Sequence, residues 1–156
     1  MAAFAGMGHI ALRVNDLETS LSFYRKLGFP EFLRLTQEDG RTWIVYLKVS
    51  DDLFIELFPG GDGGDVAAPE RTGVNHLCLT TDDIEATAAH LASVGIEATA
   101  PLVPTRRGVD GNRGMWIADP DGNRIEIMEM APDCVQYVAL KAVKAGGAAQ
   151  VLVRPI

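Results

Sequence analysis

The sequence predicts an α+β fold in which one βαβββ module occurs twice. Three observations predict it: an internal repeat whose matching residues recur at a nearly constant interval, strand-type alternation at matching positions of both halves, and a connector rich in glycine and proline between them. We expect the modules to span residues 8–58 and 74–130, with the connector at 59–73 and a C-terminal tail at 131–156. At 156 residues the chain is expected to form one domain from these two repeats.

The first module has the pattern of a strand, a helix and three further strands. Residues 8–14 alternate in a way that is typical of a strand and that places His9 and Arg13 on the same face. Asp16 is a good N-cap for the following helix, in which apolar residues recur at three- and four-residue steps as far as Leu27. The later strands are expected at residues 29–36, 42–49 and 53–58.

The second module repeats this order. His76 follows His9 at the same interval in the sequence at which the capping residue Asp83 follows Asp16. After a strand at 74–81 and this second helix, strands are expected at residues 97–103, 114–118 and 124–130. The turn sequence between the last two predicts a β-hairpin. In the tail, residues 135–144 are a candidate helix, which Gly146 and Gly147 would end.

Composition excludes several classes of partner. The chain has 47% hydrophobic and 22% charged residues and a formal net charge of -7, which argues against nucleic acid and against an anionic membrane as partners. It has no apolar run of the roughly 20 residues needed to span a bilayer, and its start lacks the pattern of a signal peptide. Two cysteines are too few for a disulfide framework, so we expect a reduced, cytoplasmic setting.

Two histidines and two glutamates occupy matching positions in the repeat. His9 and His76 stand near the start of the first strand of each module, and Glu56 and Glu126 lie in the last strands. If each module curls into half of a barrel, the His and Glu of each module share the concave face, and two facing modules form an incomplete mixed barrel around all four side chains. Imidazole and carboxylate ligands suit Ni, Zn, Co, Mn or Fe. One such residue alone is more often structural, but four in register favour a metal site.

Other side chains have both a structural and a functional interpretation. Trp43 and Trp116 could wall the pocket or fill the core, and we expect them in the core. Cys78 shares the His76 face and could approach the site, but we expect a buried structural thiol. The loop before the Trp116 strand carries three arginines that are candidates for contact with an anionic substrate, although a charged loop is usually just solvated: Arg106, Arg107 and Arg113.

Three stretches resemble the vicinal oxygen chelate superfamily, which includes glyoxalase I, methylmalonyl-CoA epimerase, fosfomycin-resistance proteins and extradiol dioxygenases. They are HIALRVNDLETSLSFYRKLGF, HLCLTTDDIEATAAHLASVGI and IADPDGNRIEIMEM, and the resemblance covers about residues 8–130. It implies two βαβββ modules that form an incomplete barrel around a divalent metal. The closest pattern is that of bacterial glyoxalase I, lactoylglutathione lyase, which takes one His and one Glu from each module. Carried over by position, these ligands are His9, Glu56, His76 and Glu126.

This resemblance implies a lyase or isomerase that needs a divalent metal and no organic cofactor. Its substrate would be a hemithioacetal of methylglyoxal and glutathione, or a similar oxygen-chelating small molecule, converted through a metal-stabilised enediolate. Glu126 is the first candidate for the base that moves the proton, with Glu56 as its counterpart. Members of the family often form homodimers.

The residues expected to contact substrate match those of glyoxalase I only in part. Arg13 matches an arginine that the family uses near the glutathione carboxylate, and Arg113 is a second candidate for substrate binding. Gly60 stands where glyoxalase I usually carries a polar residue that contacts glutathione, so the substrate need not be linked to glutathione. Two alternatives therefore remain open: a metal-dependent dioxygenase or epimerase on the same fold, and a non-catalytic binding protein of the bleomycin-resistance type.

Overall fold

The computed structural model describes residues 3–64, 66 and 68–147. The chain divides into two compact units, and the boundary near residue 68 falls inside the predicted connector. We call Met1–Ala68 with Asp119–Asn123 the N-terminal unit, and Pro69–Ala118 with Arg124–Ile156 the C-terminal unit. Residues 65 and 67 of the connector and residues 148–156 of the tail lie outside the described residues.

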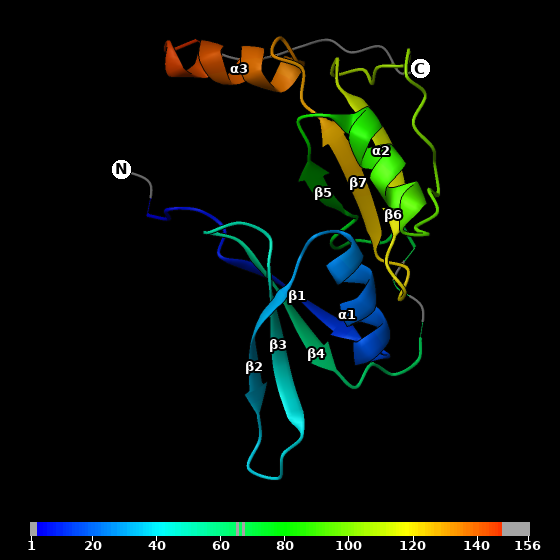
Figure 1. The fold of residues 1–156 in the computed structure, drawn as a ribbon. Helices are drawn as coiled ribbons and strands as arrows, with labels where there is room; N and C mark the ends of the chain where they lie inside the picture. Colours follow the sequence, from blue (N-terminus) through cyan, green and yellow to red (C-terminus); the bar gives the residue numbers. More distant parts are fainter. Residues whose placement is uncertain (1–2, 65, 67, 148–156) are drawn as a thin grey trace. The chain divides into compact units, whose positions relative to one another are not determined.

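The N-terminal unit has the predicted βαβββ order (Figure 1). Its elements are β1 (His9–Val14), α1 (Leu17–Lys26), β2 (Glu31–Thr36), β3 (Thr42–Lys48) and β4 (Phe54–Pro59). They form one four-stranded sheet in the order β1-β4-β3-β2, in which β1 and β4 are parallel and the other pairs are antiparallel. The chain therefore returns its last strand to the side of its first.

Helix α1 begins and packs as its sequence predicts. The side chain of Asp16 accepts a hydrogen bond of 2.7 Å from the backbone N–H of Thr19, which satisfies a donor that the first turn leaves free. The helix buries Leu21 and Tyr24 and packs against β4, where Leu57 is fully buried. This apolar layer covers one face of the sheet and leaves the other face to carry the polar side chains.

The C-terminal unit repeats the same topology with one strand fewer. Its elements are β5 (Leu77–Thr80), α2 (Ile84–Ser93), β6 (Arg113–Ala118), β7 (Arg124–Glu129) and α3 (Val135–Lys144). The sheet has the order β5-β7-β6, with β5 parallel and β6 antiparallel to β7. The two strand–helix modules with open sheets confirm the predicted α+β class, and open sheets are compatible with an incomplete barrel.

The predicted strand at residues 97–103 is wrong. The segment makes only an isolated bridge, in which Trp116 donates to the carbonyl of Ala100 at 2.9 Å and accepts from Thr99 at 2.8 Å. Pro101 has no N–H with which to continue the ladder, and Pro104 follows soon after it. Ala100 nevertheless lies beside β6, the position that β2 has beside β3 in the other sheet.

The predicted hairpin and the tail helix are both present. Strands β6 and β7 are antiparallel around the turn at 119–123, in which Gly122 has a φ of 90° that side chains rarely adopt. Helix α3 has the predicted bounds and ends where Gly147 donates to the carbonyl of Ala142. Among the helices of the described residues, none has the length and apolarity to cross a bilayer.

Candidate functional site: two His–Glu pairs and a pocket

Glu56 is a buried carboxylate in the middle of β4. Its register partners are Ala11 on β1 and Tyr46 on β3, so His9, two residues before Ala11, lies on the same face. Nδ1 of His9 is 3.5 Å from Oε1 of Glu56. Glu56 is only 7% exposed, and burial together with the adjacent carboxylate raises the pKa of Tyr46, which remains a hydroxyl donor. The imidazole and the hydroxyl compensate a charge that is costly to bury alone.

Glu126 occupies the equivalent place on β7. Its register partners are Cys78 on β5 and Trp116 on β6, and His76 lies two residues before Cys78. Nε2 of His76 is 3.3 Å from Oε2 of Glu126. The two side chains are 32% and 18% exposed, so this pair is accessible to a ligand.

The ring of His76 is held by an asparagine that sequence reasoning missed. Nδ1 of His76 lies 2.8 Å from Oδ1 of Asn75, which also accepts a hydrogen bond of 3.0 Å from Arg124. The amide group of Asn75 donates to the carbonyl of Pro69 at 2.7 Å, and this contact fixes which end of the amide faces the ring. Because Oδ1 can only accept, Nδ1 of His76 carries the proton, and the lone pair of a neutral ring is on Nε2.

This tautomer places two electron-pair donors opposite each other. A cation between Nε2 of His76 and the carboxylate of Glu126, either a proton or a metal ion, makes their contact favourable. Two atoms that each lie about 2.1 Å from one ion are about 3.0 Å apart at an octahedral angle and about 3.4 Å apart at a tetrahedral angle. The N–O separation of 3.3 Å between His76 and Glu126 lies between these values, and the 3.5 Å between His9 and Glu56 lies just above them.

The structure brings the four predicted ligands together as two separate pairs. His9 and Glu56 belong to the N-terminal unit, and His76 and Glu126 belong to the C-terminal unit. Within the described part of the chain, no three His, Cys, Asp or Glu side chains form a group that could hold a metal ion. Each unit therefore presents half of the predicted ligand set.

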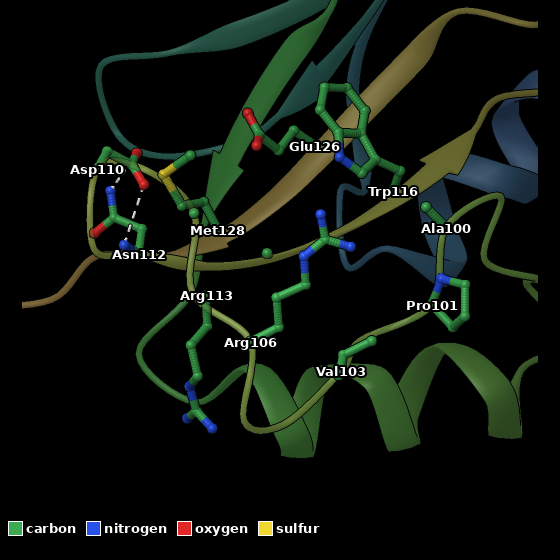
Figure 2. Close-up of a pocket in the computed structure, with 12 residues that line it drawn as sticks. Ala100, Pro101, Val103, Arg106, Asp110, Asn112, Arg113, Trp116, Glu126 and Met128 are labelled. Atoms are coloured by element: carbon green, nitrogen blue, oxygen red, sulfur yellow. Dashed lines mark hydrogen bonds between the residues drawn. The ribbon is translucent and has the colours of Figure 1, made fainter. Parts of the chain in front are cut away.

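A pocket of about 360 Å³ in the C-terminal unit contains Glu126 (Figure 2). Trp116 forms one wall, and its ring meets His76 edge to face at 4.8 Å while the Arg124 guanidinium lies 4.4 Å from its centre. Figure 2 shows the Arg106 side chain reaching toward Trp116 and Glu126. The pocket thus combines a carboxylate, an aromatic wall and a cation.

The other arginine of the pocket, Arg113 at the start of β6, points elsewhere. The guanidinium of Arg113 is 2.7 Å from Glu85 and pairs with Glu129, and these hydrogen bonds raise the pKa of Arg113. In Figure 2 its guanidinium lies away from Glu126. Arg113 and Glu129 are register partners in the hairpin, a signal that would have linked them from the sequence. Arg113 therefore lines the pocket with its stem while its charge is already matched.

Arg13 lies in a second pocket of about 450 Å³, within the N-terminal unit. Its Nη1 donates a hydrogen bond of 3.0 Å to the carbonyl of Pro59, and Gly60 and Trp43 line the same pocket. Gly60 has a φ of 85°, so a residue with a side chain would be strained there. Neither His9 nor Glu56 is among the residues that line this pocket.

Three structural expectations are corrected. Trp43 is 52% exposed and Trp116 lines a pocket, so neither is a core residue. Cys78 is exposed rather than buried, since β5 presents it on the Glu126 face of the sheet. Partial burial of the thiol and the neighbouring Glu126 carboxylate raise the pKa of Cys78 to about 11.

Comparisons with known proteins agree with this architecture. The family described as the Glyoxalase/Bleomycin resistance protein/Dioxygenase superfamily matches residues 6–127. An uncharacterized Escherichia coli K12 protein, YaeR, is 32% identical over 124 residues, which are 78% of this chain and 93% of that protein. A probable lactoylglutathione lyase of Vibrio parahaemolyticus is 28% identical over 125 residues, which are 78% of this chain and 88% of that protein. A solved glyoxalase family protein of Enterococcus faecalis is 26% identical, with a TM-score of 0.69 over 81% of this chain and 98% of that one.

Proposed function

The chain belongs to the Glyoxalase/Bleomycin resistance protein/Dioxygenase superfamily, and from this premise we propose that it is a divalent-metal-dependent lyase or isomerase of the glyoxalase I type. Its substrate is a hemithioacetal or a similar oxygen-chelating small molecule. Relatives named lactoylglutathione lyase and probable lactoylglutathione lyase support the reaction class. The two His–Glu pairs support the need for a metal.

The observation that carries the proposal is the arrangement of Asn75, His76 and Glu126. Asn75 accepts the proton of Nδ1 and thereby turns the lone pair of Nε2 toward the Glu126 carboxylate. A hydrogen-bond acceptor behind a metal-binding histidine is the usual way in which proteins orient such a ligand.

His9, Glu56, His76 and Glu126 are the residues that would hold the ion, whether Ni, Zn, Co, Mn or Fe. When bound, the ion would act as a Lewis acid on the substrate oxygens, and the reaction needs no organic cofactor. Glu126 takes a proton from a substrate carbon as general base and returns it to the neighbouring carbon as general acid. Glu126 suits this role because it lines the pocket, whereas Glu56 is buried and serves as its counterpart.

The remaining parts of the proposal concern partners. We assign Arg13 a place near the glutathione carboxylate of a substrate linked to glutathione, although Gly60 argues for substrates beyond those. We assign Arg113 to the pocket wall, which its aliphatic stem lines while its guanidinium pairs with Glu85. The protein is proposed to act as a cytoplasmic homodimer, in keeping with the family pattern.

Metal analysis followed by an isomerase assay tests the function. The purified chain is loaded with each of the five metals, its metal content is measured, and hemithioacetal conversion is recorded. About one metal per chain with isomerase activity is the expected result. His76→Ala should lose most metal affinity, while the matched variant His90→Ala, on the surface of α2, should keep it. Retention of stoichiometric metal by His76→Ala would overturn the ligand assignment.

Other outcomes separate the rival activities. Oxygen uptake that requires ferrous iron would replace the proposal with a dioxygenase. Deuterium exchange at a substrate carbon without net isomerisation of the hemithioacetal would replace it with an epimerase. Failure to bind any of the metals would replace it with a binding protein of the bleomycin-resistance type.

A further inference from the structure

Arg106 is the cation of the Glu126 pocket whose charge the described residues do not match. Its backbone N–H donates to the carbonyl of Val103, but its guanidinium makes no hydrogen bond or ion pair with any residue that the structure describes. The neighbouring loop arginines differ in this respect. Arg107 donates to the carbonyl of Gly111 at 2.9 Å, and Arg113 pairs with Glu85 and Glu129.

The acidic groups of the pocket already have partners of their own. Asp110 accepts hydrogen bonds of 2.8 Å from both Asn112 and Gln136, and although burial raises its pKa, these bonds lower it on balance. Glu126 lies against His76. Figure 2 shows Asp110 held by Asn112, to one side of the Arg106 guanidinium. The guanidinium is thus directed into the pocket with its donors available.

Apolar side chains form part of the wall around this cation. Trp116 and Met128 rise from the sheet, and Pro101 and Val103 come from the loop that leads to Arg106. A volume of about 360 Å³ lies at the low end for small-molecule sites. An occupant that satisfies both features has a small apolar body and one anionic group.

We propose that Arg106 binds the carboxylate of a small organic acid whose apolar part lies against Trp116 and Met128. Guanidinium and carboxylate form charge-assisted, paired hydrogen bonds, which fix both the position and the orientation of the acid. Only one part of this inference rests on the proposed function: that the bound acid is a substrate whose reacting carbon faces Glu126. It names the substrate class of that site and makes Arg106 its specificity-determining residue.

Benzoate and its uncharged analogue benzamide are the probes, and tryptophan fluorescence is the signal. The chain has two tryptophans, so Trp43→Phe leaves Trp116, in the wall of this pocket, as the reporter. Titrations use the full chain in the presence of a chelator, so that benzoate cannot bind through a metal. We expect saturable benzoate binding and at least about tenfold weaker binding of benzamide, a difference of about 1.4 kcal/mol.

Variants then test whether Arg106 supplies the positive charge that binds benzoate. On the Trp43→Phe background, Arg106→Gln should weaken benzoate binding about tenfold or more. Arg106→Lys keeps the positive charge but not the planar guanidinium, so it should retain part of the benzoate affinity. Arg107→Gln removes the same charge from the neighbouring residue, which does not line the pocket, and should leave benzoate binding unchanged. Far-ultraviolet circular dichroism verifies that each variant is folded.

Three results would overturn the inference: no saturable benzoate binding, equal affinity for benzamide, or an equal loss in Arg106→Gln and Arg107→Gln. The chelator separates this test from that of the proposed function. Benzoate binding that depends on Arg106 in a chain that binds no metal would keep the acid site and remove the metal-dependent activity. Metal-dependent activity without benzoate binding would keep the proposed function and remove the acid site.

Discussion

Nε2 of His76 lies 3.3 Å from Oε2 of Glu126, and the same relationship of imidazole to carboxylate recurs between His9 and Glu56 at 3.5 Å. In both units the carboxylate is on the last strand, and the histidine is near the start of the strand parallel to it. The parallel pairing creates the contact, because it brings side chains that are far apart in the sequence onto one face of a sheet. Two copies of the module consequently produce two His–Glu pairs, in which Nδ1 of His9 and Nε2 of His76 face the carboxylates.

Removal of the oxygen behind His76 should weaken metal binding without unfolding the protein. Asn75→Ala deletes the acceptor of the Nδ1 proton, so the ring loses its preferred tautomer and orientation. Loss of such a supporting partner typically costs about 10- to 100-fold in metal affinity. Competition titration with a metal-sensitive dye measures the change. Asn75→Asp keeps an acceptor oxygen and should restore most of the affinity, and equal affinities in wild type and Asn75→Ala would exclude this positioning role.

Gly114 is predicted to keep open the space beside Glu126. A methyl group at this position would lie 3.5 Å from the carbonyl oxygen of Ile127 and 3.7 Å from Oε1 of Glu126, which are ordinary contact distances. Gly114→Ala should therefore fold and gain about 0.4–1 kcal/mol through a less flexible unfolded chain. Because the methyl group enters the pocket, kcat/KM should fall.

Thermal unfolding and steady-state kinetics, measured together, check the Gly114 prediction. Gly6→Ala is the matched control, since a methyl group there meets nothing within 4 Å and the residue does not line the pocket. Unchanged kinetics in a stable Gly114→Ala protein would show that substrate does not occupy the space beside Glu126.

Arg113 should behave as a structural residue. Its guanidinium joins Glu85 of α2 to Glu129 of β7, so Arg113→Gln removes a link between helix and sheet. We expect a lower midpoint in urea with KM nearly unchanged, in contrast to Arg106→Gln, for which KM should rise more than kcat falls. A KM increase for Arg113→Gln at unchanged stability would show that the Arg113 guanidinium binds substrate.

The sequence was sufficient for elements whose local signals agree. Asp16 and Asp83 each precede an amphipathic stretch, and both side chains cap a helix by accepting a hydrogen bond from a backbone N–H three residues later. The strand expected at 97–103 from the repeated order of elements does not form, because Pro101 removes a ladder donor. Local signals of a strand therefore need to be checked against the hydrogen bonds that the backbone can make.

Lateral neighbours across a sheet were harder to predict. Tyr46 and Trp116 are separated by the same interval in the sequence as Glu56 and Glu126, and each is the register partner of the glutamate in its unit. The repeat contained this information, but assigning it requires the register of antiparallel strands, which depends on turns and bulges. Asn75 escaped notice for another reason, since a contact between adjacent side chains depends on ring orientation rather than on spacing.

A buried hydrogen bond in the N-terminal unit leads to a prediction about pH. The hydroxyl of Tyr24, which is fully buried, donates to Oδ2 of Asp119 at 2.8 Å. Tyr24→Phe removes a hydrogen bond to a carboxylate, which should cost about 1.5–3 kcal/mol of unfolding free energy near neutral pH. Asn123 still donates to the same oxygen, so the variant should remain folded.

The sign of the pH effect follows from the direction of the pKa shift. Burial, reinforced by the Asp119 carboxylate, raises the pKa of Tyr24 far above the value of about 10 for an unfolded tyrosine. The protonated phenol therefore contributes its full stability below about pH 10, and this contribution is lost as the pH rises above it, because the unfolded chain alone releases the proton. Urea unfolding of wild type and Tyr24→Phe at about pH 8 and about pH 11 measures this. The stability difference should shrink at the higher pH, since the other two tyrosines are common to both proteins. A difference that stays constant would mean that Tyr24 ionises with equal ease in the folded chain, contrary to its buried contact with Asp119.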